Sequence, residues 1–198
     1  MTTTWFTIFS IVLIWSGINP KDYFTWILEV MPALIAFVLL IVTRRRFRFT
    51  NLSYALILVH CIILMIGGHY TYAEVPVFNW LKDVFDLNRN NYDKVGHLAQ
   101  GFIPAIVARE ILIRNNVVNN KHWRTVFIIS ICLSVSALYE LIEWWVAELS
   151  GTSAEAFLGT QGYVWDTQSD MGLALLGAFL SLLLLSHYHD RQLKNMKT

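Results

Sequence analysis

The chain has 198 residues, of which 56% are hydrophobic and only 15% are charged. Soluble domains carry about 25% charged residues, so the composition excludes an ordinary soluble domain and indicates an integral membrane protein. The formal net charge is +1, which gives no basic field for nucleic acid, and we therefore expect the lipid bilayer, and no nucleic acid, as a partner.

Apolar runs of roughly 17 to 25 residues, the length that crosses a bilayer, occur about six times. Because backbone without hydrogen-bond partners is not tolerated in lipid, each run is expected to be a helix. The sequence thus predicts an all-α, polytopic membrane protein: one domain over residues 1–198, a bundle of about six transmembrane helices, with its functional half at 52–188. The runs are Thr4 to Ile18, Tyr23 to Thr43, Leu52 to Thr71, Asp93 to Ile113, Trp123 to Leu149 and Asp170 to Tyr188.

The first run is the shortest and ends at Asn19-Pro20. It is preceded by no basic region and followed by no small-residue cleavage site, so we expect a retained span and not a signal peptide. Cys61 and Cys132 lie inside apolar runs without paired spacing, which is typical of small buried residues and not of a zinc site or disulfide.

Basic residues near the ends of the runs predict the orientation of the helices. They gather after the second run, between the fourth and fifth runs, and in the tail, so these segments and both termini are expected in the cytoplasm. The basic residues concerned are Arg44, Arg45, Arg46, Arg48, Arg114, Lys121, Arg124, Arg191, Lys194 and Lys197.

Acidic and imidazole side chains fall at the opposite, extracytoplasmic ends of the last four runs. Asp93, His97 and Gln100 have the spacing of one helix face. Ser136, Glu140 and Glu143 form a second polar stripe in the fifth run. Glu140 lies about ten residues from the end of its run, or roughly 15 Å inside it. A carboxylate at that depth costs about 2.5 to 3.5 kcal/mol unless a partner compensates it.

These side chains predict one polar or metal site. A histidine with carboxylates suits zinc, iron or manganese, and a bound metal could activate water against an ester or phosphoester of a lipid. The expected catalytic residues are Asp93, His97, Glu140 and Glu143. The expected metal ligands are His69, Glu74, His97, Glu143, Asp166 and Asp170.

Each of these residues also has a structural interpretation. His97 could hydrogen-bond a neighbour at a helix entry. Asp166 could cap the last helix, and Asp170 could favour its dipole. His60, in the middle of the third run, is interpreted as a core histidine. Nucleotide-binding loops, GxSxG elbows and HExxH motifs are missing from the sequence, which disfavours nucleotide-driven transport and the familiar serine and zinc peptidases.

An ordered set of motifs resembles the bacterial YjdF-like inner-membrane proteins, a family of undefined activity. It consists of residues 67–76, Tyr92 to Pro104, Glu140-Leu141-Ile142-Glu143-Trp144, residues 157–162 and residues 165–171, and it spans nearly the whole chain. The resemblance implies a multi-pass protein of the bacterial cytoplasmic (inner) membrane.

A looser similarity is to the VanZ-like membrane proteins, associated with glycopeptide resistance. It is carried by Asp93-Lys94-Val95-Gly96-His97, then Glu140 or Glu143, then Asp166 or Asp170 before Gly172. The glutamine and arginine that usually follow the VanZ glutamate are missing here. The order of motifs suggests a shared four-helix core.

Three functions remain open on the sequence alone. The first is a metal-dependent hydrolase acting on a lipid-linked substrate of the cell envelope. The second is a small permease or proton-coupled binding protein that uses the same carboxylates without a metal. The third is a structural or assembly protein, since small residues between Gly172 and Gly177 can support a homo-oligomer.

Overall fold

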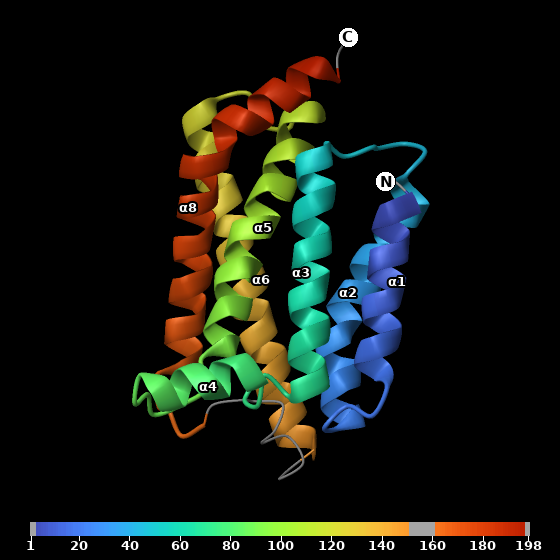
Figure 1. Cartoon of the computed structure of the whole chain (residues 1–198). Helices are drawn as coiled ribbons and strands as arrows, with labels where there is room; N and C mark the ends of the chain where they lie inside the picture. The colour runs from blue at the N-terminus through green and yellow to red at the C-terminus, as the bar shows by residue number, and fades with distance from the viewer. Residues whose placement is uncertain (1–2, 151–160, 197–198) are drawn as a thin grey trace.

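The structure is a computed structural model that describes residues 3–150 and 161–196. In these residues six long helices run side by side and form a bundle, with no strand (Figure 1). This confirms the all-α membrane fold that the composition predicts. The long helices are α1 (Thr3–Gly17), α2 (Tyr23–Thr43), α3 (Asn51–Tyr70), α5 (Tyr92–Arg114), α6 (Lys121–Ser150) and α8 (Asp166–Asn195).

The helices extend beyond some of the apolar runs. α8 begins at Asp166, before the predicted Asp170, and continues to Asn195. The predicted run was shorter because the first and last turns of the helix are polar and give no hydropathy signal. α2, α3, α6 and α8 are long and apolar enough to cross a membrane. α1 has 15 residues. α5 lies beside α8 (Figure 1), and its buried residues include His97, Arg109 and Glu110. The bundle is consistent with about six crossings.

The closest helix pair is α5 with α8. A Cβ on Gly101 would lie 1.7 Å from the carbonyl oxygen of Ala174, and one on Gly177 would lie 2.2 Å from the carbonyl oxygen of Leu98. Only glycine at these two positions lets the backbones approach so closely. This contact fixes the start of α8 against the start of α5, where the predicted site residues lie.

On the other side of the bundle, α1 and α2 both pack on α3. Their shared core contains Phe9 of α1, Val30 of α2 and Met65 of α3, each at most 1% exposed. Trp5 stacks on Phe9 and its Nε1 donates a hydrogen bond to the backbone oxygen of Tyr54, at 2.8 Å. These contacts hold α1 and α2 as a pair attached through α3.

A short helix that the sequence analysis did not predict, α4 (Pro76–Val84), crosses one end of the bundle (Figure 1). Its nine residues are too few for a span and fall between two apolar runs. Val77 and Trp80 are exposed, whereas Asn79 accepts a hydrogen bond from Asn90 at 2.8 Å. α4 therefore covers the entry to α5, with Phe78 packed on Tyr92 and Asn79 bonded to Asn90.

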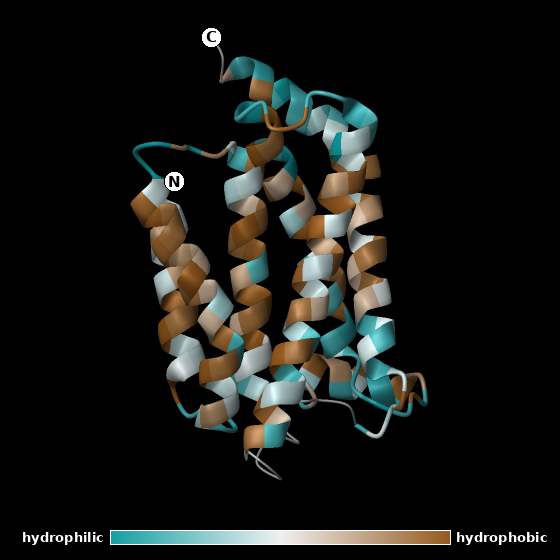
Figure 2. Ribbon diagram, turned by 180° about the vertical axis from the view of Figure 1, so that it is seen from behind, coloured by the Kyte–Doolittle hydropathy of each residue, from teal (hydrophilic) through white to brown (hydrophobic). Residues whose placement is uncertain are grey.

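Hydrophobic residues dominate the middle of the bundle and hydrophilic residues gather at its two ends (Figure 2). The start of α1 and the end of α8 lie at the same end as the α2–α3 and α5–α6 connections (Figure 1). We call this the basic end, because it carries those of the arginines and lysines named above that the structure describes. The opposite end, called the acidic end, holds the starts of α5 and α8; its extracytoplasmic placement stays a prediction.

Candidate functional site

The site at the acidic end is centred on His97 of α5, which is 7% exposed. Its Nε2 lies 3.1 Å from Asp93 Oδ1, one turn earlier on the same helix, and 3.8 Å from Asp170 Oδ2 of α8. Its Nδ1 lies 3.2 Å from Gln100 Oε1 and 3.9 Å from Glu140 Oε1 of α6. Three helices thus converge on one imidazole ring.

Both ring nitrogens of His97 face oxygen atoms. A carboxylate only accepts hydrogen bonds, so Nε2 donates its proton to Asp93. Nδ1 then faces Gln100 Oε1 and Glu140 Oε1, which are also hydrogen-bond acceptors. This arrangement calls for a positive centre at Nδ1, either a second proton or a metal ion.

Two glutamates of α6 stand beside His97, and Glu140 Oε1 lies on the Nδ1 side of the ring. Glu140 is 9% exposed, and its Oε1 is buried without a hydrogen-bond partner in the described part of the chain. One ligand atom each from His97, Glu140 and Glu143 lie within 4.8 Å of one another. An unpartnered buried carboxylate oxygen is costly, and a cation bound among these three residues would compensate it.

A second group of possible ligands consists of Asp93, His97 and Asp170, also within 4.8 Å. Here two cationic side chains, Lys94 and Arg89, contact the aspartates. Lys94 Nζ lies 2.7 Å from Asp170 Oδ1 and 3.0 Å from Asp166 Oδ1. Arg89 bridges Asp166 Oδ1 at 2.5 Å and Asp93 Oδ2 at 3.0 Å. Within the described residues, Glu140 has no such contact with a lysine or arginine, and its ion-pair contact is with His97.

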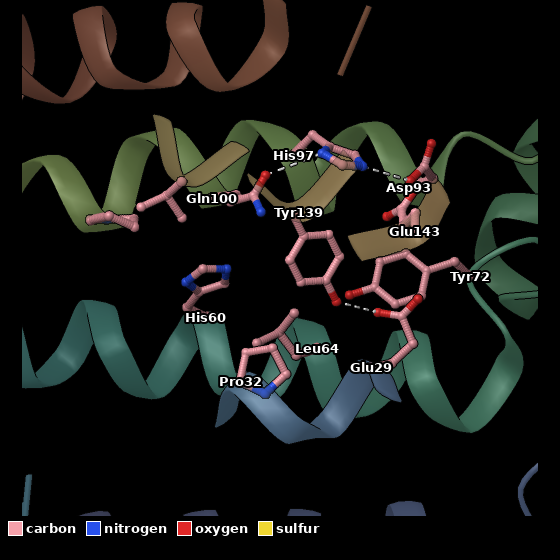
Figure 3. A pocket seen from close by; sticks show the side chains of 13 residues that line it. Glu29, Pro32, His60, Leu64, Tyr72, Asp93, His97, Gln100, Tyr139 and Glu143 are labelled. Carbon is pink, nitrogen blue, oxygen red and sulfur yellow. Dashed lines mark hydrogen bonds and ion pairs between the residues drawn. The ribbon is translucent and has the colours of Figure 1, made fainter. Parts of the chain in front are cut away.

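A cavity of about 120 Å³ opens on the glutamate side. Glu29 of α2 stands across it from Glu143 and Asp93, and its Oε2 accepts a hydrogen bond from the Tyr139 hydroxyl of α6 at 3.2 Å (Figure 3). The lining residues are Glu29, Pro32, His60, Leu64, Tyr72, Asp93, Gly96, His97, Gln100, Pro104, Val135, Tyr139 and Glu143. The cavity therefore has a polar wall beside His97 and an apolar wall beyond His60.

Tyr72 closes the cavity from the connection after α3. Thr71 and Tyr72 both have left-handed backbone conformations, with φ of 57° and 53°, and this turn directs the Tyr72 ring toward Gly67 and Gly96. Burial, with the nearby Glu29 carboxylate, raises the pKa of Tyr72 well above its usual value. Its hydroxyl therefore stays a neutral donor at any physiological pH.

Two of the expected metal ligands lie elsewhere. His69 Nδ1 is 3.0 Å from the backbone oxygen of Ser16, and its ring packs on Trp15 and Tyr70. Glu74 pairs with Lys21, and both side chains are about half exposed. The residues that the structure brings together are Asp93, His97, Glu140, Glu143, Asp166 and Asp170, with Asp166 held by Arg89 and Lys94.

The connection before α8 touches the site region through Gln161. Its Oε1 accepts a hydrogen bond from the backbone nitrogen of Asn90 at 3.0 Å, and its Nε2 donates one to the Asn90 oxygen at 2.9 Å. The preceding part of the motif at 157–162, residues 157–160, lies outside the described residues.

Comparison with known proteins agrees with the membrane fold. Residues 1–191 match the model of a family described as "Predicted membrane protein (DUF2238)". The chain belongs to this family. It is 49% identical over 185 residues to the inner membrane protein YjdF of Escherichia coli strain K12, which covers 93% of this chain and 88% of that protein. No solved structure matches the chain.

These comparisons confirm the resemblance to the YjdF-like proteins and the assignment as a multi-pass membrane protein. The relative's name places that protein in the inner membrane, as expected for this chain. The orientation of the termini and the chemistry of the site stay predictions.

Sequence reasoning missed several residues of the site. Glu29 is one carboxylate in an otherwise apolar run, and that isolation was the available signal. Arg89 and Lys94 were not assigned to the site, although they contact three of its aspartates. Tyr139, the neighbour of Glu140, points to the other side of the cavity and binds Glu29.

A second buried charge network at the basic end was also missed. Glu110 of α5 is fully buried and accepts hydrogen bonds from the Thr50 backbone nitrogen at 2.9 Å and the Ser53 hydroxyl at 2.6 Å. Its carboxylate also lies 2.9 Å from Arg114 Nη1 and 3.2 Å from His189 Nε2. Hydrogen-bond donors and basic side chains thus satisfy both oxygens of the Glu110 carboxylate, and this network joins α3, α5 and α8 structurally.

Proposed function

We propose that this protein is a metal-dependent membrane hydrolase that cleaves an ester or phosphoester of a lipid-linked substrate at the acidic end of the bundle. The observation that carries the proposal is the convergence of Glu140 and Glu143 on His97, with Glu140 Oε1 buried and without a hydrogen-bond partner in the described residues. Arg89 and Lys94 contact the aspartates nearby, whereas the ion-pair contact of this carboxylate oxygen in the described residues is with the His97 ring, at 3.9 Å.

The donor set fits a divalent metal of the zinc, iron or manganese class, which accept histidine together with carboxylates. His97, Glu140 and Glu143 would hold it. Asp93 accepts the Nε2 proton of His97 at 3.1 Å, the arrangement that orients a ligating histidine and raises its basicity. Asp93 is therefore a positioning residue in this proposal.

A metal held by these residues would supply a Lewis acid and an activated water. Water adds to the carbonyl carbon or phosphorus, and the bond to the leaving alcohol oxygen breaks. Glu29, on the opposite wall of the cavity (Figure 3), is placed to accept the proton of the water and return it to that oxygen. The neutral Tyr139 hydroxyl holds Glu29 in place.

The lipid-linked nature of the substrate is supported by where the cavity lies. Its walls come from helices of the bundle, and residues such as Leu64 and Pro104 continue it toward the hydrophobic middle of the protein. A water-soluble substrate would have little reason to contact that wall, whereas a lipid would place its hydrocarbon part there.

The competing function is a proton-coupled permease. It is favoured if a second proton, and not a metal ion, occupies Nδ1 of His97. A proton path across the bundle would have to connect the cavity with Glu110 at the basic end. The described residues beyond His60 are mainly apolar, including Cys61, Ile103 and Val107. The assembly alternative loses support because Gly177 is used inside the chain, against Leu98.

The experiment is a lipid turnover assay with purified protein in vesicles made from a bacterial membrane lipid extract. Products are measured by mass spectrometry after addition of zinc, manganese or iron, and after chelation. The proposal expects products only with metal, and their loss in Glu143→Gln. Glu148→Gln is the matched control, because Glu148 lies on the same helix with an exposed side chain outside the cavity.

A wild-type protein that leaves all extract lipids unchanged under every metal condition would contradict the hydrolase. Equal turnover by wild type and Glu143→Gln would contradict the assigned site.

A further inference from the structure

Beside the polar cavity lies a larger apolar groove of about 360 Å³ between α2, α3 and α5. Pro32, His60, Leu64 and Pro104 line both spaces. The groove is therefore a continuation of the cavity, and a molecule lying in one can extend directly into the other.

The groove exists because α2 packs on α3 and makes no extended contact with α5 in the described chain. Small side chains on α2, Ala33 and Ala36, leave space opposite Val107 of α5. Leu39 at its edge is 56% exposed, so the groove is open toward the surrounding lipid. Nearly all of its lining side chains are apolar.

The groove follows α2 from Pro32 to Thr43, which is roughly 16 Å at 1.5 Å per residue. That is about half of the 30 Å hydrocarbon thickness of a bilayer. An unfilled apolar space forfeits packing contacts along its walls, and in a membrane the available filler is a hydrocarbon chain. The length fits one chain lying along the helix axis.

We infer that the groove binds a hydrocarbon chain of the substrate, and that this chain positions the attached ester or phosphoester beside His97 in the cavity. This inference rests on the proposed function, and it identifies the substrate class as a lipid whose single chain enters between α2 and α5. Because the groove and the cavity are continuous, a chain that lies against Ala36 in the groove places its head group past His60, near Glu143 in the cavity.

The test is photo-crosslinking with a defined probe, phosphatidylglycerol that carries a diazirine midway along one acyl chain, diluted into phosphatidylcholine nanodiscs containing the full chain. Labelled residues are located by peptide mass spectrometry. The expected result is labelling of groove-lining residues of α2 and α5 above that of Ile35, which faces away from the groove and is 52% exposed. Labelling no greater in the groove than at Ile35 overturns the inference.

Two variants fill the groove from opposite walls, Ala36→Phe on α2 and Val107→Phe on α5. Each is expected to reduce groove labelling to the level seen at Ile35, and Ile35→Phe, on the same helix as Ala36, is expected to leave it unchanged. Undiminished groove labelling in both filled variants overturns the inference. If neither variant folds, the wild-type comparison with Ile35 still decides.

The inference and the proposed function fail separately. Groove labelling without lipid turnover under any metal condition retains the lipid site and rejects the hydrolase. Turnover with no preferential labelling of the groove retains the hydrolase and rejects this chain-binding site.

Discussion

The two buried charge networks of this bundle differ in one respect, the balance of charge. Around Glu110, at the basic end, hydroxyls, a backbone amide, an arginine and a histidine satisfy the carboxylate completely. Around His97, at the acidic end, Arg89 and Lys94 contact the aspartates, but Glu140 Oε1 has no hydrogen-bond partner in the described residues. Both networks join several helices, and only one leaves a buried acceptor without a donor.

The difference separates a structural network from a candidate site. A buried charge that is fully paired stabilises one arrangement of helices, and loss of either partner is costly. A cluster with excess carboxylates is unfavourable alone and gains from a bound cation. The same residue types therefore predict opposite responses to substitution at the two ends, and the following experiments test that contrast in order of expected size.

The largest effect is expected for Glu110→Gln. The amide would remove the charge that Arg114 and His189 contact and would present a donor to Thr50 or Ser53. We expect a loss of about 3 to 5 kcal/mol, seen as a fall of roughly 6 °C or more in the thermal midpoint of the detergent-purified protein. Glu140→Gln should not lower the metal-free midpoint; an equal fall in both variants would remove the contrast.

Metal addition should produce the next largest effect. At a free metal concentration of 100 times the dissociation constant, binding stabilises the folded protein by about 2.7 kcal/mol. The rise in thermal midpoint should occur in wild type and Glu148→Gln and disappear in Glu143→Gln. A similar rise in Glu143→Gln would show that metal binds elsewhere on the chain.

A smaller effect is expected for Asp93→Asn, because Asp93 orients His97 without binding the metal. Loss of such an orienting carboxylate weakens metal affinity by about 10- to 100-fold, whereas His97→Ala should abolish specific binding. Metal titration by calorimetry measures both. Complete loss in Asp93→Asn, equal to that of His97→Ala, would instead place Asp93 among the ligands.

The smallest effect is expected at the surface of the acidic end. Glu74 pairs with Lys21, and both side chains are half exposed, so Glu74→Gln should change stability by less than about 1 kcal/mol. Its metal affinity should equal that of wild type. A measured loss of affinity would return Glu74 to the ligand set that the sequence predicted.

Hydropathy was sufficient to predict the bundle, because a span must be both apolar and helical. The contact of His97 with Asp93 and Gln100 was also predictable, since residues three and four apart on a helix are neighbours. The direction of Glu74 was not, because the left-handed backbone at Thr71 and Tyr72 turns the chain there. That of His69 was not, because spacing within α3 does not show that its ring faces Ser16 of α1.

Pairs distant in sequence escaped prediction for a different reason. Glu110 and His189 are 79 positions apart, and Glu29 and Tyr139 are 110 apart. Neither the spacing nor the composition of one helix shows which face of another it meets. These pairs depend on the close α5–α8 approach at Gly101 and on the separation of α2 from α5, which are properties of the packed bundle.

The central claim, a divalent metal held by His97, Glu140 and Glu143, is tested most directly by elemental mass spectrometry of the detergent-purified protein. Wild type, His97→Ala, Glu143→Gln and the control Glu148→Gln are measured after reconstitution with zinc, manganese or iron and removal of free metal. The account predicts one metal ion per chain in wild type and in Glu148→Gln, and none in the other two variants. Wild type without metal after all three reconstitutions, or metal retained in His97→Ala, would contradict it.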